Sequence, residues 1–206
     1  FLRFLVLLPW TIFVVMLHFL ASALSQRLFF IFYNLLFLGL TKIFGIKIKY
    51  SGVPEKKNVL FVSNHISYLD IMILGSSVKA IFVAKSDIDK WPIINKLCRL
   101  GKTIFVERDK IRSISNQMNN IKEKMREGFN VILFPEGTSS DGSKVLKFKS
   151  SLFKLVDYQD LKDFNLQPIS ISYSKLDGLP LDKIFRPFLA WFGSMDLLSH
   201  AWKFWA

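Results

Sequence analysis

Hydrophobic residues are concentrated at the start of the chain. The stretch from Phe4 to Ser25 contains no Lys, Arg, Asp or Glu, and a helix of about 20 apolar residues is long enough to cross a bilayer. A second apolar stretch, Leu28 to Leu40, is shorter and rich in aromatic residues, which is typical of a helix lying in the membrane interface. We therefore expect residues 1–44 to be a membrane anchor or interfacial helices, and residues 45–206 to be a separate folded domain.

Three interpretations of this apolar front end compete. Arg3, the apolar core and Ala21-Ser22-Ala23 resemble the three parts of a signal peptide, but the second apolar stretch would then have no role. A membrane anchor is favoured, either as a transmembrane helix or as a helical hairpin in one leaflet. Only Arg3 precedes the apolar span, whereas four basic residues follow it: Arg27, Lys42, Lys47 and Lys49. By the positive-inside rule, this asymmetry places the domain on the cytoplasmic face of the cell (inner) membrane.

Beyond residue 44, short apolar runs alternate with helical patterns. Ile46 to Tyr50 alternates apolar and polar residues, like a half-exposed strand. Further strands are predicted at 58–63, 80–84, 103–106, 131–134 and 166–173. Helices are predicted at 111–127, 151–158 and 194–205, with Gly128 at the C-cap of the first. This alternation predicts an α/β fold with a mostly parallel central sheet flanked by helices.

Polar residues follow three of the predicted strands at the point where each strand ends. They are Ser63-Asn64-His65, Glu107-Arg108 and Pro135-Glu136-Gly137-Thr138. Ligands of parallel α/β sheets bind at the carboxyl ends of the strands. We therefore expect these three clusters to contribute to one site.

His65 and Asp70 are the candidate catalytic pair. On one continuous helix, a separation of five residues would turn the two side chains about 140° apart. If His65 lies in a loop and the helix begins near Ser67, however, the carboxylate can turn back toward the imidazole. A carboxylate that orients the ring and stabilises its positive charge makes histidine a better general base. In the alternative interpretation, Ser67-x-x-Asp70 only caps the helix, and Asp70 accepts hydrogen bonds from backbone amides.

The other two clusters contain features suited to an anion. Arg108 follows a predicted strand, and a guanidinium can donate two parallel hydrogen bonds to a phosphate. An ion pair with a neighbouring acid such as Glu107 is the alternative. Gly137 and Thr138 lie in a small-residue turn whose backbone amides can face an anion. Glu136 is an unfavourable neighbour for a phosphate and is more suited to ordering the loop or pairing with a cation.

Composition narrows the possible partners and chemistries. The chain has 28 Lys and Arg against 16 Asp and Glu, a formal charge of +12. Beside an apolar terminus, this excess favours an anionic membrane over nucleic acid, for which no recognition motif is present. The single Cys98 excludes an intramolecular disulfide, and the three isolated histidines give no metal-ligand spacing. Without Gly-x-Ser-x-Gly, a Walker loop or a dinucleotide fingerprint, a serine hydrolase and a nucleotide-binding enzyme are disfavoured.

Together, four segments resemble the motifs of the PlsC family of glycerolipid acyltransferases, whose best-known members are 1-acylglycerol-3-phosphate acyltransferases. Asn64 to Asp70 matches the NHxxxxD motif of that family, and Gly101 to Arg108 resembles its second motif. Phe134 to Thr138 matches the third, and Leu166-Gln167-Pro168-Ile169 the proline-containing fourth. The stretch from Gly137 to Gly142, followed by Phe148-Lys149-Ser150, also resembles the branch that contains lyso-ornithine lipid acyltransferases.

The resemblance implies a reaction and a set of roles. His65 would take the proton from the hydroxyl of the acceptor, with Asp70 orienting the ring. Asn64, Arg108, Glu136, Gly137 and Thr138 are the candidate substrate-binding residues, with Arg108 on the acceptor phosphate. The expected substrates are a lysophospholipid in the membrane, 1-acylglycerol-3-phosphate first, and acyl-CoA or acyl carrier protein as the donor. No metal or other cofactor is implied.

Two alternatives remain open. The same chemistry could act on lyso-ornithine lipid, which has no phosphate. The chain could also be a non-catalytic membrane protein that binds anionic lipid and keeps only the fold.

Overall fold

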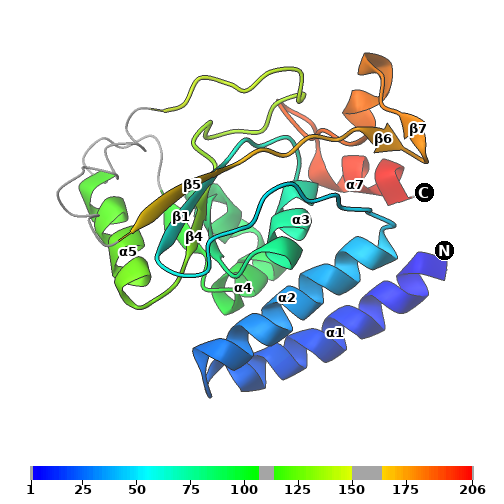
Figure 1. Cartoon of the computed structure of the whole chain (residues 1–206). Helices are drawn as coiled ribbons and strands as arrows, with labels where there is room; N and C mark the ends of the chain where they lie inside the picture. Colours follow the sequence, from blue (N-terminus) through cyan, green and yellow to red (C-terminus); the bar gives the residue numbers. More distant parts are fainter. Residues whose placement is uncertain (1, 107–113, 150–163, 206) are drawn as a thin grey trace. The chain divides into compact units, whose positions relative to one another are not determined.

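Five short strands form the sheet of the computed structural model, which describes residues 2–106, 114–149 and 164–205 (Figure 1). They are β1 (Val59–Ser63), β2 (Ile81–Lys85), β3 (Ile104–Val106), β4 (Val131–Leu133) and β5 (Asn165–Ile169). All neighbouring strands pair in parallel, in the order β3-β2-β4-β1-β5. The prediction of a mostly parallel sheet is therefore confirmed.

The two strands at the middle of the sheet position the site. Every residue of β1 and of β4 is buried, because a parallel sheet is covered on both faces and needs apolar side chains on each. Leu60, Phe61 and Val62 of β1 lie opposite Val131, Ile132 and Leu133 of β4. Since β1 and β4 are neighbours and run the same way, the residues that follow them leave the sheet at the same edge.

The edge strand β5 explains an otherwise unfavourable residue. Pro168 lies inside β5, opposite Val62 of β1, and proline cannot donate a hydrogen bond to a sheet. Proline is tolerated at this position because β5 has a neighbour on one side only. Residues of β5 are correspondingly half-buried or exposed, in contrast to those of β1.

Helix α5 (Ile114–Arg126) packs beside β3 and β4, and α4 (Pro92–Leu100) follows the short helical turn η1 (Ser86–Lys90). The predicted C-cap of α5 is confirmed, since Gly128 has a φ of 89°. Its amide donates to the Met125 carbonyl at 2.9 Å, and the Phe129 amide to the Lys124 carbonyl at 3.0 Å. This pair of bonds is a Schellman motif, which needs a left-handed residue such as glycine. The predicted helix at 151–158 lies outside the described residues.

The chain divides into two compact units. Pro54–His65 and Ala80–Ser172 form the unit that contains the sheet. The other unit consists of Phe1–Val53, Ile66–Lys79 and Tyr173–Ala206. Its elements are α1 (Leu2–Ser22), α2 (Gln26–Ile43), α3 (Leu69–Ser77), β6 (Lys175–Leu176), β7 (Leu179–Pro180), η4 (Lys183–Phe188) and α7 (Leu197–Trp205).

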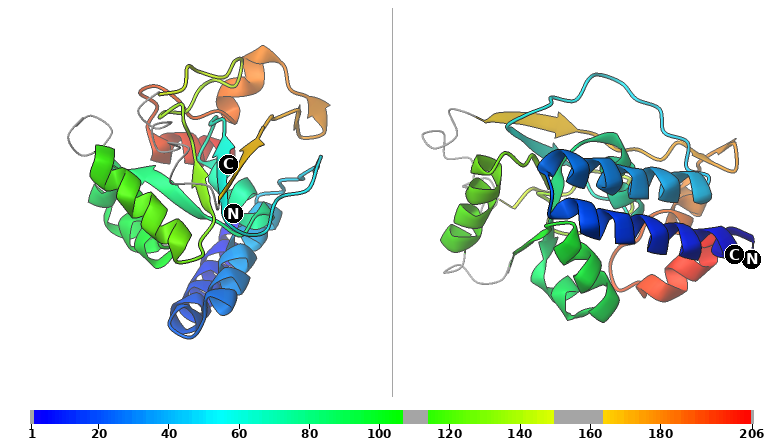
Figure 2. Two further views of the ribbon diagram at one scale, coloured as in Figure 1. Left: turned by 60° about the vertical axis from the view of Figure 1, so that its left-hand side comes forward. Right: turned by 90° about the horizontal axis from the view of Figure 1, so that it is seen from below.

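The apolar front end forms two helices, α1 and α2, which lie side by side along their length in both views of Figure 2. Ser25 caps α2, its side chain accepting the Leu28 amide at 3.2 Å. Aromatic side chains hold the pair together, with the His18 ring of α1 lying 4.7 Å from that of Phe29 in α2. Both predicted helices are confirmed, and the pair has the form of the hairpin considered in the sequence analysis.

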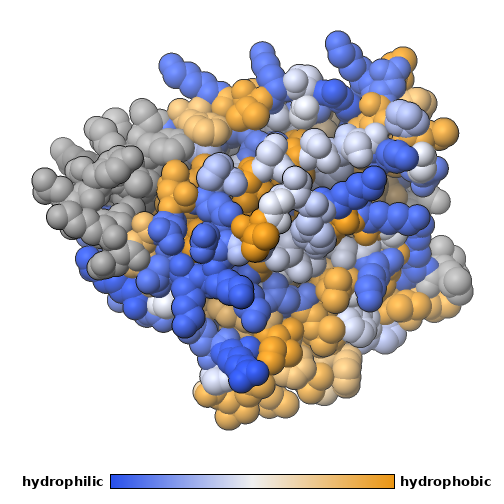
Figure 3. Space-filling view, in the orientation of Figure 1, coloured by the Kyte–Doolittle hydropathy of each residue, from blue (hydrophilic) through white to orange (hydrophobic). Residues whose placement is uncertain are grey.

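One face of α1 exposes large apolar side chains that a soluble protein would cover. Leu8 is 64% exposed and Phe19 65% exposed. Residues Leu5–Ser22 form one candidate membrane span by length and hydropathy. Hydrophobic side chains gather over α1 and α2 in Figure 3, which has the orientation of Figure 1. An apolar helix with an unburied face is suited to lipid contact.

Helix α3 is fastened to α2 within the same unit. The Asn34 side chain of α2 donates to the carbonyls of Gly75 and Val78 at the end of α3, at 2.5 and 3.0 Å. At Gly75 the backbone of α3 lies against the Phe37 ring, and an added Cβ would overlap that ring. Helix α3 therefore has a fixed place on the hairpin, and it carries Asp70 in its first turn.

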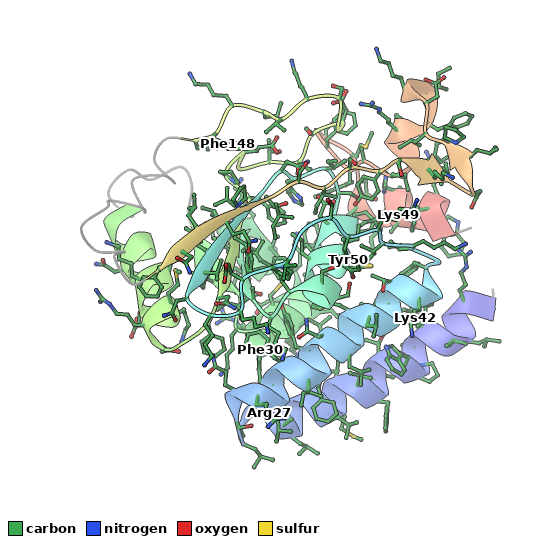
Figure 4. The ribbon with its side chains drawn as sticks, in the orientation of Figure 1. Arg27, Phe30, Lys42, Lys49, Tyr50 and Phe148 are labelled. Carbon is green, nitrogen blue, oxygen red and sulfur yellow. The ribbon has the colours of Figure 1, made fainter. Side chains whose placement is uncertain are left out.

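The predicted strand from Ile46 to Tyr50 is wrong, because these residues belong to no strand. Their burial does alternate, with Ile46 and Ile48 half-buried and Lys47 and Lys49 exposed. The pattern therefore indicates a segment with one covered face. A strand also requires a neighbouring strand to pair with, and the alternation of one segment does not show whether a neighbour exists. Tyr50 and Lys49, labelled in Figure 4, lie on the extended chain that leaves α2.

Candidate active site

His65 lies two residues beyond the end of β1, in the unit that contains the sheet. Its half-buried ring stacks on the Phe134 ring, with centroids 4.1 Å apart and planes 19° from parallel. Phe134 directly follows β4 and stacks in turn on Phe82 of β2, with centroids 6.3 Å apart. Buried aromatic rings have few rotamers, so this platform holds the imidazole in one orientation at the carboxyl edge of the sheet.

The backbone of His65 is fixed by the loop that follows β4. The His65 amide donates to Glu136 Oε1 at 2.8 Å, and the His65 carbonyl accepts from the Ser140 amide at 2.9 Å. The other carboxylate oxygen of Glu136, Oε2, accepts from the Leu146 amide at 2.8 Å. Glu136 is only 2% exposed, and a buried carboxylate requires such partners. These contacts are those of a residue that positions His65, while direct contact of Glu136 with substrate stays a prediction.

Asn64 fixes the same segment from the other side. Its side-chain amide donates to the Ile171 carbonyl at 3.0 Å, and its side-chain carbonyl accepts from the Ile171 amide at 2.8 Å. An asparagine side chain thus continues the pairing of β1 and β5 past the end of the strands. Asn64 and Glu136 together hold the backbone on each side of His65, and substrate contact by Asn64 stays a prediction.

Asp70 lies fully buried in the first turn of α3. Its Oδ2 atom accepts from the amides of Ile66 at 2.6 Å and Ser67 at 2.9 Å. Its Oδ1 atom accepts from the hydroxyl of Tyr173 at 2.6 Å. Since α3 begins at Leu69, His65 precedes the helix, which was the condition for Asp70 to turn back. Ile66, whose amide Asp70 binds, is joined to His65 by a peptide bond.

Two tyrosine hydroxyls in the unit of Asp70 stay protonated at neutral pH. Burial, followed by the negative charge of Asp70, raises the pKa of Tyr173 well above its usual value. Burial raises the pKa of Tyr68 to about 12. The Tyr68 hydroxyl lies 3.3 Å from His200 Nδ1, whose Nε2 is 3.0 Å from the Pro187 carbonyl. In the second contact Nε2 is the donor, because a carbonyl oxygen can only accept.

The turn after β4 contains Gly137 and Thr138. The Gly137 amide donates to the Phe134 carbonyl at 3.1 Å, which closes the turn, and Gly137 has a φ of 73°. Thr138 is exposed, and its amide donates no hydrogen bond to the described part of the chain. The predicted turn is therefore present, and the Thr138 amide has no partner among the described residues, while anion binding by the turn stays a prediction. That either residue binds substrate stays a prediction.

Gly137→Ala is expected to destabilise the turn. A left-handed backbone costs about 1–2 kcal/mol in a residue with a Cβ. The new Cβ would also lie 2.8 Å from Lys149 Cε. We expect a drop of about this size in unfolding free energy, measured by denaturant titration in detergent. Gly193→Ala is the matched control, because Gly193 has a φ of 65° and open space around it. Equal stability of Gly137→Ala and the wild type would contradict the assigned geometry.

Two other residues singled out from the sequence need separate statements. Arg108, the candidate phosphate ligand, lies outside the described residues, and its role stays a prediction. Burial raises the pKa of the Cys98 thiol, which therefore remains protonated at neutral pH. A thiol is a weak nucleophile compared with a thiolate, so Cys98 is a poor candidate for an acyl-enzyme.

The structure also shows positioning residues that the sequence analysis did not select. Tyr173 binds the candidate carboxylate from beyond β5, and Ser140 binds the His65 carbonyl. Phe134 supplies the ring under the imidazole. Phe134 was part of a recognised motif, which could have indicated a role. Ser140 likewise lies in the stretch from Gly137 to Gly142 that resembles a family branch, whereas Tyr173 had no local pattern around it and gave no such signal.

Fold and site together define an α/β protein with a histidine at the end of a central parallel strand and an anion-suited turn after its neighbour. A family model described as Acyltransferase matches residues 47–172. The chain belongs to this family, and the PlsC-type resemblance of its motifs is confirmed.

Similar proteins agree with this assignment. The lyso-ornithine lipid O-acyltransferase of Rhizobium meliloti (strain 1021) is 38% identical over 76% of this chain and 55% of its own length. The 1-acyl-sn-glycerol-3-phosphate acyltransferase of Neisseria gonorrhoeae is 36% identical over 49% of this chain and 40% of its own length. The chain thus spans about half the length of the curated relatives it matches.

A crystal structure shares the fold. It is that of the 1-acyl-sn-glycerophosphate (LPA) acyltransferase PlsC from Thermotoga maritima, with a TM-score of 0.55 and 20% identity. The match covers 82% of this chain and 83% of that one.

Proposed function

We propose that this chain transfers a fatty acyl group from a thioester carrier to the free hydroxyl of a lysolipid at a membrane. The observation that carries the proposal is the fixed position of His65 at the carboxyl edge of the sheet. Both its ring and its backbone are held, by Phe134, Glu136 and Ser140. A general base must keep a fixed orientation toward the proton that it takes.

In the proposed reaction, the His65 imidazole takes the proton of the acceptor hydroxyl. The hydroxyl oxygen attacks the thioester carbonyl carbon, and the tetrahedral intermediate collapses with cleavage of the carbon–sulfur bond. The departing sulfur takes the proton from the imidazolium, which leaves an ester and a free thiol. Acyl transfer is direct, because neither a serine elbow nor a reactive cysteine is available for an acyl-enzyme.

Asp70 is proposed to orient the imidazole and stabilise its positive charge. The support comes from its hydrogen bonds, since the side chain accepts from several donors, as a buried carboxyl group requires. Two of those donors are the amides of Ile66 and Ser67, so the segment directly after His65 turns back over the carboxylate. The capping interpretation from the sequence analysis describes these two bonds, and it is compatible with the catalytic one.

For the acceptor, we place lyso-ornithine lipid first and 1-acylglycerol-3-phosphate second. The sequence analysis had the reverse order. The lyso-ornithine relative matches a longer part of this chain than the glycerophosphate relative does. Both headgroups carry an anion, a carboxylate in the first and a phosphate in the second. We also propose that the donor is acyl-CoA or acyl carrier protein and that the reaction needs no cofactor. The domain is proposed to lie on the cytoplasmic face of the membrane.

The test of the acceptor uses the purified chain in detergent with acyl-CoA and each lysolipid separately, following release of free thiol. We expect a higher kcat/KM with lyso-ornithine lipid. A preference for 1-acylglycerol-3-phosphate would keep the mechanism and reverse the order of acceptors. No release with either lipid, or with acyl carrier protein as donor, would contradict the proposed activity and favour a lipid-binding protein.

A further inference from the structure

The loop after β4 folds back onto the turn at the end of that strand. The Leu146 amide donates to Glu136 Oε2 at 2.8 Å, and the Lys149 amide donates to the Pro135 carbonyl at 2.9 Å. Residues 146–149 are therefore held against the turn by two hydrogen bonds. Phe148, just before Lys149, is labelled in Figure 4 on this returning loop. The backbone of Lys149 consequently has a defined position beside Gly137.

The side chain of Lys149 lies across Gly137. A Cβ on Gly137 would be 2.8 Å from Lys149 Cε, 2.9 Å from Cδ and 3.3 Å from Nζ. Glycine leaves the space that the lysine stem occupies, and the ammonium group ends beside the turn. Lys149 forms no ion pair within the described part of the chain.

The surroundings of this ammonium are suited to an anion. The exposed Thr138 amide in the same turn donates no hydrogen bond to the described residues, and Gly137 shares the turn. The turn follows β4, and His65 follows the adjacent β1, to which Glu136 of the turn is bonded. An ammonium group whose backbone is held beside the turn, together with the Thr138 amide, gives this edge of the sheet the donors that an anion subsite needs.

We infer that Lys149 binds the anionic group of the lysolipid acceptor, the carboxylate or phosphate of its headgroup. This inference rests on the proposed function. A lysine ammonium acts as a point charge and does not require the planar geometry that an arginine prefers. Lys149 can therefore bind an acceptor with either anion. Gly137 then both forms the turn and leaves space for the Lys149 side chain.

The test compares Lys149→Gln with Lys147→Gln, because Lys147 is also an exposed lysine and lies two residues earlier. We expect Lys149→Gln to raise the KM for lyso-ornithine lipid about tenfold, the usual effect of losing a charged hydrogen bond. The KM for acyl-CoA and the kcat should change by less than about twofold, which is small beside the tenfold effect of losing a charged hydrogen bond. Lys149→Arg should restore most of the acceptor affinity, and Lys147→Gln should match the wild type.

A neutral acceptor separates headgroup binding from other effects. On a monoacylglycerol, which has the hydroxyl and no anion, Lys149→Gln should match the wild type. A rise in the KM for acyl-CoA alone would show that Lys149 binds a phosphate of the donor, and would overturn the inference. Equal acceptor KM values for Lys149→Gln and Lys147→Gln would overturn it as well. Turnover by the wild type tests the proposed function independently, so the two failures are distinguishable.

Discussion

His65→Ala is expected to lower kcat/KM for acyl transfer by about 10³-fold, within the range that a general base contributes. Without the imidazole, the acceptor hydroxyl keeps its proton and attacks the thioester poorly. The protein should remain folded, because the ring is only half-buried and its stacking on Phe134 is worth about 0.5–1.5 kcal/mol. Thiol release under saturating acyl-CoA, together with thermal unfolding, measures both quantities on the same preparation.

Phe134→Leu is the control for this variant. It removes the ring beneath the imidazole and leaves the base in place, so we expect a loss of roughly tenfold, well below the range for loss of a general base. A His65→Ala protein that keeps a tenth or more of wild-type activity would show that another group takes the proton.

Asp70→Asn has the second largest expected effect, a loss of about 10²-fold or more in kcat with little change in stability. The asparagine oxygen can still accept from the Ile66 and Ser67 amides. Its amide group then faces Tyr173, whose hydroxyl can rotate and accept. These three hydrogen bonds are kept while the negative charge is lost. Single-turnover rates at saturating substrates give the effect on the chemical step.

Two further variants separate charge from structure. Asp70→Ala leaves two buried amides without a partner, at about 1–3 kcal/mol each, and should unfold more easily than Asp70→Asn. Tyr173→Phe removes one hydrogen bond and keeps the charge, so its activity should lie between those of the wild type and Asp70→Asn. If Asp70→Asn were as active as the wild type, Asp70 would be a helix cap and no more.

The sheet could be predicted because its central strands are buried on both faces. Apart from Ser63 at the end of β1, every position of β1 and β4 is apolar, and such short runs stand out between polar segments. The site followed from the same logic, since polar residues directly after buried strands gather at one edge. His65 and Glu136 were selected in this way, and the structure joins them through the His65 amide.

Features that depend on distant partners could not be predicted. Ile46 to Tyr50 has the alternation of a strand and lacks a neighbour, which no local pattern reveals. Tyr173 reaches Asp70 across more than a hundred residues. The hairpin of β6 and β7, in contrast, had a local signal that was overlooked. Asp177 and Gly178 both have positive φ, 50° and 85°, and an Asp-Gly pair between short strands is typical of such a turn.

The helical hairpin changes how the charge of the front end is interpreted. Arg27 lies at the start of α2 and Lys42 near its end, as labelled in Figure 4. Since α2 runs back beside α1, these two residues lie at opposite ends of the hairpin. The basic residues counted after α1 therefore do not all lie at one end of the hairpin, because Arg27 lies at the other end from Lys42. The proposed orientation depends on Lys42, Lys47 and Lys49.

The most direct test of the central claim follows a labelled acyl group. The purified chain is given acyl-CoA labelled in the acyl carbonyl, with a lysolipid, and both free thiol and labelled ester are quantified. Direct transfer predicts one ester formed for each thiol released, no label on the protein, and neither product with His65→Ala. Thiol release without ester would indicate a thioesterase, and label retained on the protein would indicate an acyl-enzyme. Either result would contradict direct transfer to a lysolipid hydroxyl with His65 as the base.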